Sequence, residues 1–218
     1  MTALVPNRLL FKFEFPIHRC PKPLPLDGDV DQWGERYRLP PLCALDDEQG
    51  FGQVYAAWDA GGLYVGCRVG GKRRAPNCDP QRFRHSDCLR VMTDMRDTRD
   101  IRRATRFCQH WYLLPAGGGT RKNEAVGGAA KVARAMQDAP VAAADDITIA
   151  SGVTKTGYGL TALLSRNALA GFDPTENPRI GFFYILEDGE LGRQSLTVGD
   201  DLNWWIDPST WPTAVLVE

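Results

Sequence analysis

Long hydrophobic runs are missing from this sequence of 218 residues. No segment approaches the about 20 consecutive apolar residues that a membrane-spanning helix needs. The first residues also lack the basic and then apolar order of a secretory signal, so a cytoplasmic location is expected by default. With 26 Lys and Arg against 27 Asp and Glu, the chain has almost no net charge. We therefore expect neither a membrane nor a nucleic acid as its partner.

Histidine is scarce, and paired cysteine motifs are missing. Only three histidines are present, and the sequence contains no His-Glu-x-x-His helix, no Ser-x-x-Lys pair and no nucleophile elbow. The absence of a Cys-x-x-Cys pair argues against a zinc knuckle and against a thioredoxin-like redox site. We expect most of the cysteines to be buried thiols. They are Cys20, Cys43, Cys67, Cys78, Cys88 and Cys108.

Three segments match binding motifs only in part. Residues 66–73 resemble a P-loop but end in Arg73, where the motif needs the Ser or Thr that holds magnesium. Residues 157–162 resemble a dinucleotide-binding turn but continue into an alternating strand pattern instead of a helix. The acidic segment that begins at Asp27 lacks the glycine and the bidentate glutamate of an EF-hand. No cofactor is therefore expected, with a structural calcium ion left open as an alternative.

Alternation of apolar and polar residues is the strongest pattern that the sequence does contain, and a period of two is typical of half-buried strands. Residues 9–15 alternate in this way up to Pro16, which predicts a first strand that ends there. Residues 53–58 and 63–69 predict two strands of a hairpin, because an Asp-Ala-Gly-Gly turn joins them. Further strands are predicted at residues 87–93, 107–114, 147–153, 158–164, 180–186 and 214–217.

Helical periodicity is nearly absent. Short helical turns are predicted at residues 31–35, 166–170 and 129–136, the last within a long Gly- and Ala-rich loop that begins at Ala116. Many short strands with turn residues between them predict an all-β fold, a single-domain antiparallel β-sandwich that spans the whole chain. Residues 1–23 are expected to supply an N-terminal strand and a proline-rich lead-in.

Charge is unevenly distributed along the chain. Residues 72–106 are strongly basic, and residues 138–218 are strongly acidic. No helix-turn-helix or aromatic-rich RNA-binding pattern accompanies the basic segment. We therefore interpret it as a solvated face with internal ion pairs to the acidic segment, and not as a nucleic-acid surface.

A series of separated segments carries a resemblance to one known family. It consists of Leu26–Trp33, Ala56–Val65, Ser86–Asp94, Gly157–Tyr158, Arg179–Phe182 and Trp205–Ser209. These segments include a hydrophobic-Asp-Gly turn that leads to a Trp, a hairpin with Trp-Asp before its turn, and an Asp-led strand that ends in Asp. In this order they resemble the family-9 carbohydrate-binding modules, within the wider group of DOMON-like β-sandwich domains, over about residues 24–218.

The resemblance implies a jelly-roll-like sandwich that binds an oligo- or polysaccharide without catalysis, usually as an appendage of a glycan-degrading enzyme. In the family, two aromatic rings sandwich a terminal sugar, and Trp205 and Phe83 fall on or next to those positions. The polar contacts depart from the family pattern. Arg90 stands in place of a carboxylate, Asn203 lies one position beyond a family asparagine, and His110 lies two positions beyond a family arginine.

The tryptophans are expected to divide between the core and the binding surface. Trp204 and Trp205 are neighbours on an extended segment and must point in opposite directions, so one is expected to be buried and one exposed. Trp33, Trp58 and Trp111 are expected in the core. The expected sugar-binding residues are Trp205, Phe83, Arg90, Asn203, His110 and Trp204, and Arg90 adds an acidic sugar as an alternative ligand.

Three other functions stay open beside non-catalytic sugar binding, which the sequence favours. The sandwich could be an interaction or assembly domain without a sugar, or an enzyme in its own right. It could also hold haem b, as some DOMON domains do between a Met and a His, with Met92, Met95, His85 and His110 as candidates. The compartment stays open too, because polysaccharide-binding modules mostly work outside the cell.

Overall fold

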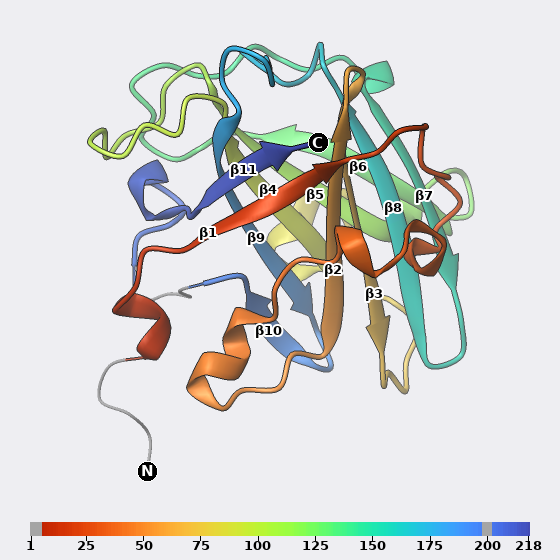
Figure 1. The fold of residues 1–218 in the computed structure, drawn as a ribbon. Coiled ribbons are helices and arrows are strands. Elements are labelled where there is room, and N and C mark those ends of the chain that lie inside the picture. The colour runs from red at the N-terminus through yellow and green to blue at the C-terminus, as the bar shows by residue number, and fades with distance from the viewer. Residues whose placement is uncertain (1–5, 198–201) are drawn as a thin grey trace.

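The computed structural model describes residues 6–197 and 202–218, except for the Leu9 side chain (Figure 1). Eleven strands account for nearly all the regular structure of these residues. The strands are β1 (Glu14–Arg19), β2 (Gly52–Asp59), β3 (Gly62–Gly70), β4 (Cys88–Asp94), β5 (Cys108–Gly118), β6 (Glu124–Ala130), β7 (Ile147–Val153), β8 (Gly157–Ser165), β9 (Arg179–Asp188), β10 (Gly192–Ser195) and β11 (Thr213–Val217). The helices are short 3₁₀ turns, η1 (Asn7–Leu9), η2 (Val30–Trp33), η3 (Glu35–Tyr37), η4 (Leu42–Asp46), η5 (Pro80–His85), η6 (Ala144–Asp146) and η7 (Pro208–Thr210). None of these described helices is long and apolar enough to cross a membrane.

The strands form one continuous sheet in the order β6-β5-β4-β9-β11-β1-β2-β3-β8-β7, with β10 paired to β9. The sheet folds over on itself, so that β4, β5 and β9 lie behind β1, β2, β3 and β8 (Figure 1). The end strands β6 and β7 lie against each other, which nearly closes the sheet. The predicted all-β sandwich is thereby confirmed.

Apolar side chains from the alternating strands fill the space between the two layers. Leu63 and Val65 of β3 pair with Leu164 and Ala162 of β8, and all four side chains are fully buried. Because successive side chains of a strand point to opposite faces, each alternating segment contributes one buried face. Removal of this surface from water, at about 25 cal/mol per Å², is the main force that holds the layers together.

The three tryptophans that the sequence places in the core are buried, as predicted. Trp58 and Trp111 belong to the main core between the layers. Trp33 lies in a second, smaller cluster, where its ring packs edge-on against Tyr64 with 6.2 Å between the ring centroids.

The basic and acidic segments meet, as their charges predict. The Lys72 ammonium lies 2.5 Å from a carboxylate oxygen of Asp188. The Arg90 guanidinium lies 3.2 Å from a carboxylate oxygen of Glu187. These pairs join the end of β3 and the middle of β4 to the end of β9, so part of the local charge is neutralised inside the fold.

The first strand lies further along the chain than the predicted residues 9–15. β1 passes through Pro16, and Phe11 in the expected strand is 62% exposed. β1 is also parallel to both of its neighbours, β11 and β2, so a purely antiparallel sheet is wrong at this point. β2 pairs with β1 only from His18 onward, and a strand tolerates a proline where one of its flanks is unpaired.

The Gly- and Ala-rich segment after Ala116 is only partly a loop, because it contains β6. A Cβ atom on Gly128 of β6 would lie 2.3 Å from the Tyr112 hydroxyl oxygen of the neighbouring β5. The glycine therefore lets this aromatic side chain pass over the strand. The predicted helical turn at residues 129–136 is wrong, because the strand pairing with β5 continues to Ala130.

The remaining short elements follow the sequence less closely than the long strands. The turn predicted at residues 31–35 is divided between η2 and η3, and residues 166–170 form turns without a helix. Alternation does not predict β10, because a strand of four residues is too short to display a period.

Candidate functional site

The residues that the sequence singles out lie on the side of the β4-β5-β9 layer that faces away from the space between the layers. Arg90 in β4 stands between Leu89 and Val91, whose side chains are in the core, so Arg90 points to the opposite side. His110 in β5 pairs directly with Met92, two residues beyond Arg90, and therefore shares its side of the sheet. The register of two strands thus brings Arg90 and His110 together.

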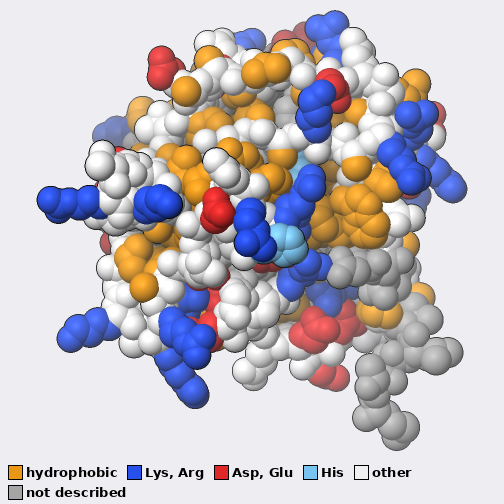
Figure 2. All heavy atoms as spheres, turned by 180° about the vertical axis from the view of Figure 1, so that it is seen from behind, with side chains coloured by type: hydrophobic (Ala, Val, Ile, Leu, Met, Phe, Trp, Pro, Cys, Tyr) orange, Lys and Arg blue, Asp and Glu red, His pale blue; other side chains and the backbone are white. Residues whose placement is uncertain are grey.

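A cleft of about 360 Å³ opens on this side of the sheet. η5, β4, β5, β9, β10, the segment after β6 and the segment before η7 all contribute side chains to it. Figure 2, which shows the molecule from behind Figure 1, shows Lys and Arg side chains gathered around a histidine beside hydrophobic surface. The polar and aromatic residues that line the cleft are Arg84, His85, Arg90, His110, Lys131, Glu187, Arg193, Trp204 and Trp205.

Trp204 and Trp205 form one wall of the cleft. Trp204 is 4% exposed and Trp205 is 39% exposed, which confirms that one is buried and one is not. Their rings meet edge to face, with 5.6 Å between the centroids. The backbone here is held by the carbonyl of Asn203, which accepts hydrogen bonds of 2.9 Å from the backbone N–H groups of Ile206 and Asp207. The exposed indole is therefore carried on an ordered turn.

Arg90 lies on the floor of the cleft and is 4% exposed. Its guanidinium lies over the Trp204 ring, 4.8 Å from the ring centroid, and its Nη2 atom lies 3.2 Å from Glu187 Oε1. Burial lowers the pKa of Arg90 from its ordinary value, while the charge of Glu187 opposes that change. Its Nε–H has no hydrogen-bond partner among the described residues.

His110 is also buried, and burial together with the charges of Arg90 and Arg84 lowers its pKa to about 3. The imidazole is therefore neutral at ordinary pH, with one donor and one acceptor nitrogen. Its Nε2 atom has no hydrogen-bond partner among the described residues. Phe83 packs edge-on against the ring, with 5.9 Å between the centroids.

Glu187 supplies the one carboxylate among the residues that line the cleft within the described part of the chain. Its Oε1 atom accepts a hydrogen bond of 2.8 Å from Arg193 Nε and lies 3.2 Å from Arg90 Nη2. Its Oε2 atom is buried and has no partner in the described structure. The carboxylate thus keeps an acceptor that a ligand donor could satisfy.

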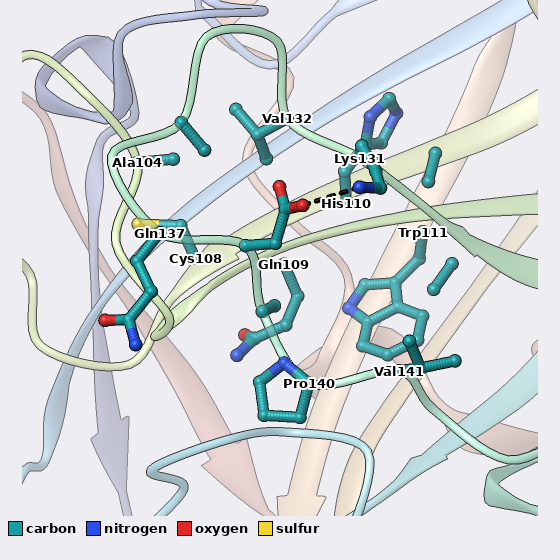
Figure 3. A pocket seen from close by; sticks show the side chains of 15 residues that line it. Ala104, Cys108, Gln109, His110, Trp111, Lys131, Val132, Gln137, Pro140 and Val141 are labelled. Carbon is teal, nitrogen blue, oxygen red and sulfur yellow. Dashed lines mark hydrogen bonds and ion pairs between the residues drawn. The ribbon is translucent and has the colours of Figure 1, made fainter.

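A second cavity, of about 250 Å³, adjoins the cleft and shares His110 and Lys131 with it. Figure 3 shows Trp111 on one side of this cavity and Cys108 and Gln137 on the other. Most of its lining is alanine, valine and proline. Lys131 forms an ion pair of 2.6 Å with Asp138 here, drawn as a dashed line in Figure 3.

The structure brings together four of the six residues that the sequence predicts for sugar binding. Trp204, Trp205, Arg90 and His110 all line the cleft. They come from β4, β5 and the segment before η7, which are far apart in the sequence and meet only in the folded chain.

Phe83 and Asn203 lie beside the cleft and not in its lining. The Phe83 ring is stacked on Tyr112, with 4.5 Å between the centroids and 14° between the planes, so one of its faces is covered. Asn203 is exposed at the surface of the turn that carries the two tryptophans. Phe83 supports His110 from the side, and Asn203 holds the turn through its backbone.

Sequence reasoning did not assign five polar residues of the cleft to sugar binding, although it named one of them, His85, as a haem candidate. Arg84 and His85 directly follow Phe83, a predicted sugar-binding residue, and this position in the sequence was the one signal that could have indicated them. Glu187 and Arg193 are brought in by the pairing of β9 with β4 and β10, and Lys131 by the end of β6. No local pattern marks these residues, because their neighbours in space are distant in the chain.

The structure also shows where the residues considered for a metal ion or haem lie. Within residues 6–197 and 202–218, no three His, Cys, Asp or Glu side chains cluster as a metal site would require. Of the haem candidates, Met92 and His110 are both buried and pair with each other across β4 and β5. Met95 is fully buried, and His85 is exposed at the rim of the cleft.

Structure comparison finds the same fold in solved carbohydrate-binding modules. A family-9 carbohydrate-binding module from Caldicellulosiruptor kristjanssonii in complex with cellotriose has a TM-score of 0.65 and 13% identity, over 94% of this chain and 94% of that chain. A family-9 module from the same organism in complex with glucose has a TM-score of 0.62 and 15% identity, over 92% of this chain and 95% of that chain. No protein-family model and no curated protein matches the sequence.

Proposed function

We propose that this chain, which has the fold of a family-9 carbohydrate-binding module, binds a saccharide in the cleft beside Trp205 and catalyses no reaction on it. The observation that carries the proposal is the concentration of unpartnered buried polar atoms around this one exposed indole. Buried polar groups in proteins nearly always have hydrogen-bond partners, so a cluster without them is suited to a polar ligand.

The unpartnered atoms offer both kinds of hydrogen bond. Arg90 Nε and Trp204 Nε1 are donors, and Glu187 Oε2 is an acceptor. His110 Nε2 takes either role, depending on the tautomer. Sugar hydroxyls donate and accept at the same time, and adjacent hydroxyls on a pyranose ring could therefore satisfy a mixed set of this kind.

Trp205 supplies the apolar part of the recognition. One face of a pyranose ring presents C–H groups, and a flat aromatic ring removes that face from water while its polar edge remains free. Trp205 is exposed at the border of the cleft, next to the polar floor, so one sugar ring could contact both. The solved modules of the same fold hold cellotriose and glucose, which supports a saccharide ligand here.

The arrangement of charges supports binding without catalysis. Glycoside hydrolysis uses two carboxyl groups on either side of the scissile bond. In the described part of the cleft, Glu187 is the single carboxylate, and two arginines hold one of its oxygens. A chain of this kind would serve a glycan-degrading enzyme as a binding partner, and that pairing is part of the proposal.

Trp205→Ala tests the proposal. We expect the substitution to weaken saccharide binding by at least about tenfold, because a stacked aromatic side chain in a binding site typically contributes more than about 1.4 kcal/mol. Intrinsic tryptophan fluorescence and isothermal titration calorimetry against a panel of neutral and acidic oligosaccharides would measure it. Because the side chain is partly exposed, the thermal midpoint should stay the same.

The matched control is Phe11→Ala, which removes an exposed aromatic ring outside the cleft and should leave binding intact. Saturable binding that is equal in the wild type and in Trp205→Ala would refute the indole as the platform. A panel in which no saccharide binds the wild type would refute the function itself.

A further inference from the structure

We infer that the saccharide is acidic, with a carboxylate or sulfate group on the sugar ring that the arginines of the cleft receive. The inference rests on the proposed function and adds the chemical class of the ligand. It is carried by the charge of the cleft lining together with the unpartnered donor of Arg90.

The lining is strongly positive although the whole chain is nearly neutral. Arg84, Arg90, Lys131 and Arg193 face one carboxylate, Glu187, within the described residues. Two of these cations, Arg90 and Arg193, share the same carboxylate oxygen. Arg90 therefore shares its carboxylate partner, and an anionic ligand group could give this guanidinium a second contact.

Arg84 adds charge that nothing in the described structure neutralises. Its guanidinium lies over the Phe83 ring, 5.3 Å from the centroid, and no described carboxylate forms an ion pair with it. The effect of this charge reaches the cleft floor, since Arg84 contributes to the lowered pKa values of both His110 and Arg90. Lys131 differs, because Asp138 pairs with it on the side of the second cavity.

The guanidinium groups suit an oxyanion in geometry as well as in charge. Arginine presents N–H donors in a planar fork that matches the oxygens of a carboxylate or sulfate. The Arg90 side chain is buried, stacked on Trp204 and anchored by Glu187, so its free Nε–H is held in place before a ligand arrives. A donor that is ordered in advance loses little entropy on binding.

Other anions fit the cleft less well than an acidic sugar. The free Glu187 Oε2 acceptor needs a hydrogen-bond donor, which a sugar hydroxyl supplies and a sulfate or acetate ion does not. The exposed Trp205 indole offers an apolar face for which a small inorganic anion has no use. A ring that carries one anionic group, several hydroxyls and an apolar face uses all of these features.

The test compares saccharides that differ only in charge. The binding of cellotriose to the protein is compared with that of the same trimer oxidised to the carboxylate at C6 and with that of its 6-O-sulfate. The binding of trigalacturonate is compared with that of its carboxyl-reduced form. We expect an acidic member to bind at least about tenfold more tightly than its neutral partner. A rise from about 50 mM to about 200 mM salt should weaken only the acidic ligands, because added ions screen the attraction.

Arg84→Gln locates the preference in the cleft. The side chain is exposed, so the variant should fold normally, and the ratio of acidic to neutral affinity should fall to near one. Arg121→Gln, at an exposed position of the turn between β5 and β6, is the matched control and should behave as the wild type. A comparison of the C6-carboxylate trimer with the 6-O-sulfate trimer shows which anionic group the cleft accepts.

Each failure has its own signature. Neutral partners that bind as tightly as the acidic ones would overturn the acidic class and leave saccharide binding supported. Sodium sulfate or acetate that binds as tightly as the acidic trimers would overturn it too, because the cleft would then recognise an anion without a sugar. Absence of binding to every saccharide would overturn the proposed function as well.

Discussion

His110 stays neutral in the folded protein at pH values where a free histidine takes up a proton. Burial and the charges of Arg90 and Arg84 lower its pKa to about 3. In the unfolded chain its pKa is about 6.5, so the unfolded state binds the proton first as the pH falls. The stability that follows from this difference is fully present above about pH 6.5 and is lost progressively between about pH 6.5 and about pH 3.

We therefore expect His110→Gln to flatten the acid side of the stability profile. Urea unfolding of the wild type and the variant at about pH 7.5 and about pH 4.5 would measure it. The wild type should lose up to about 1.4 kcal/mol more per pH unit than the variant over that range. His85→Gln, at an exposed position, serves as the control and should follow the wild type. Parallel profiles for the wild type and His110→Gln would contradict the assignment.

A buried ion pair network joins the strands that support the cleft. Lys72 follows β3, Asp87 precedes β4 and Asp188 ends β9, and all three side chains are almost fully buried. The Lys72 ammonium lies 2.9 Å from Asp87 and 2.5 Å from Asp188. Asp87 also accepts a hydrogen bond of 2.7 Å from the backbone N–H of Gly189. The network holds the start of β4, and therefore the segment after η5, against the end of β9.

Lys72→Met should destabilise the protein by about 3–5 kcal/mol, because it leaves two buried carboxylates next to each other without a cation. Urea unfolding near neutral pH would measure the change. Lys155→Met, in the exposed turn between β7 and β8, should change stability by less than about 0.5 kcal/mol. A small and equal effect of both substitutions would show that the network contributes little.

The protein as a whole is held together without covalent cross-links between its strands. All six cysteines lie in the described residues, and each is a free thiol, five of them buried and Cys78 partly exposed. Burial raises the pKa of Cys67 and of Cys108 to about 12. A thiol with a raised pKa is rarely in the reactive thiolate form, so the native fold protects these groups.

We expect the thermal midpoint to be the same with and without a reducing agent. A thiol reagent that absorbs light on reaction should modify the native protein slowly, with Cys78 as the first site, and should titrate all six cysteines only after unfolding. Peptide mapping of the partly modified protein would identify the first site. A midpoint that drops on reduction would show that disulfides form in solution.

Alternation, turn residues and the scarcity of helical periodicity were enough to predict an all-β sandwich, most of its strands, and the burial of Trp33, Trp58 and Trp111. These properties depend on which side chains follow one another in a strand, and that order is local. Through the family resemblance, the sequence also indicated Trp205 and Arg90 as residues of one binding site.

The cleft itself could not be read in the same way. Glu187 and Arg193 meet Arg90 because β9 pairs with both β4 and β10. The parallel β1 lies between β2 and β11, which are distant from each other in the sequence. Pairing between distant strands is selected by the packing of the whole sheet, so no short segment encodes it. Sequence therefore decided the type of fold and its buried faces, whereas tertiary contacts decided which charges surround the exposed indole.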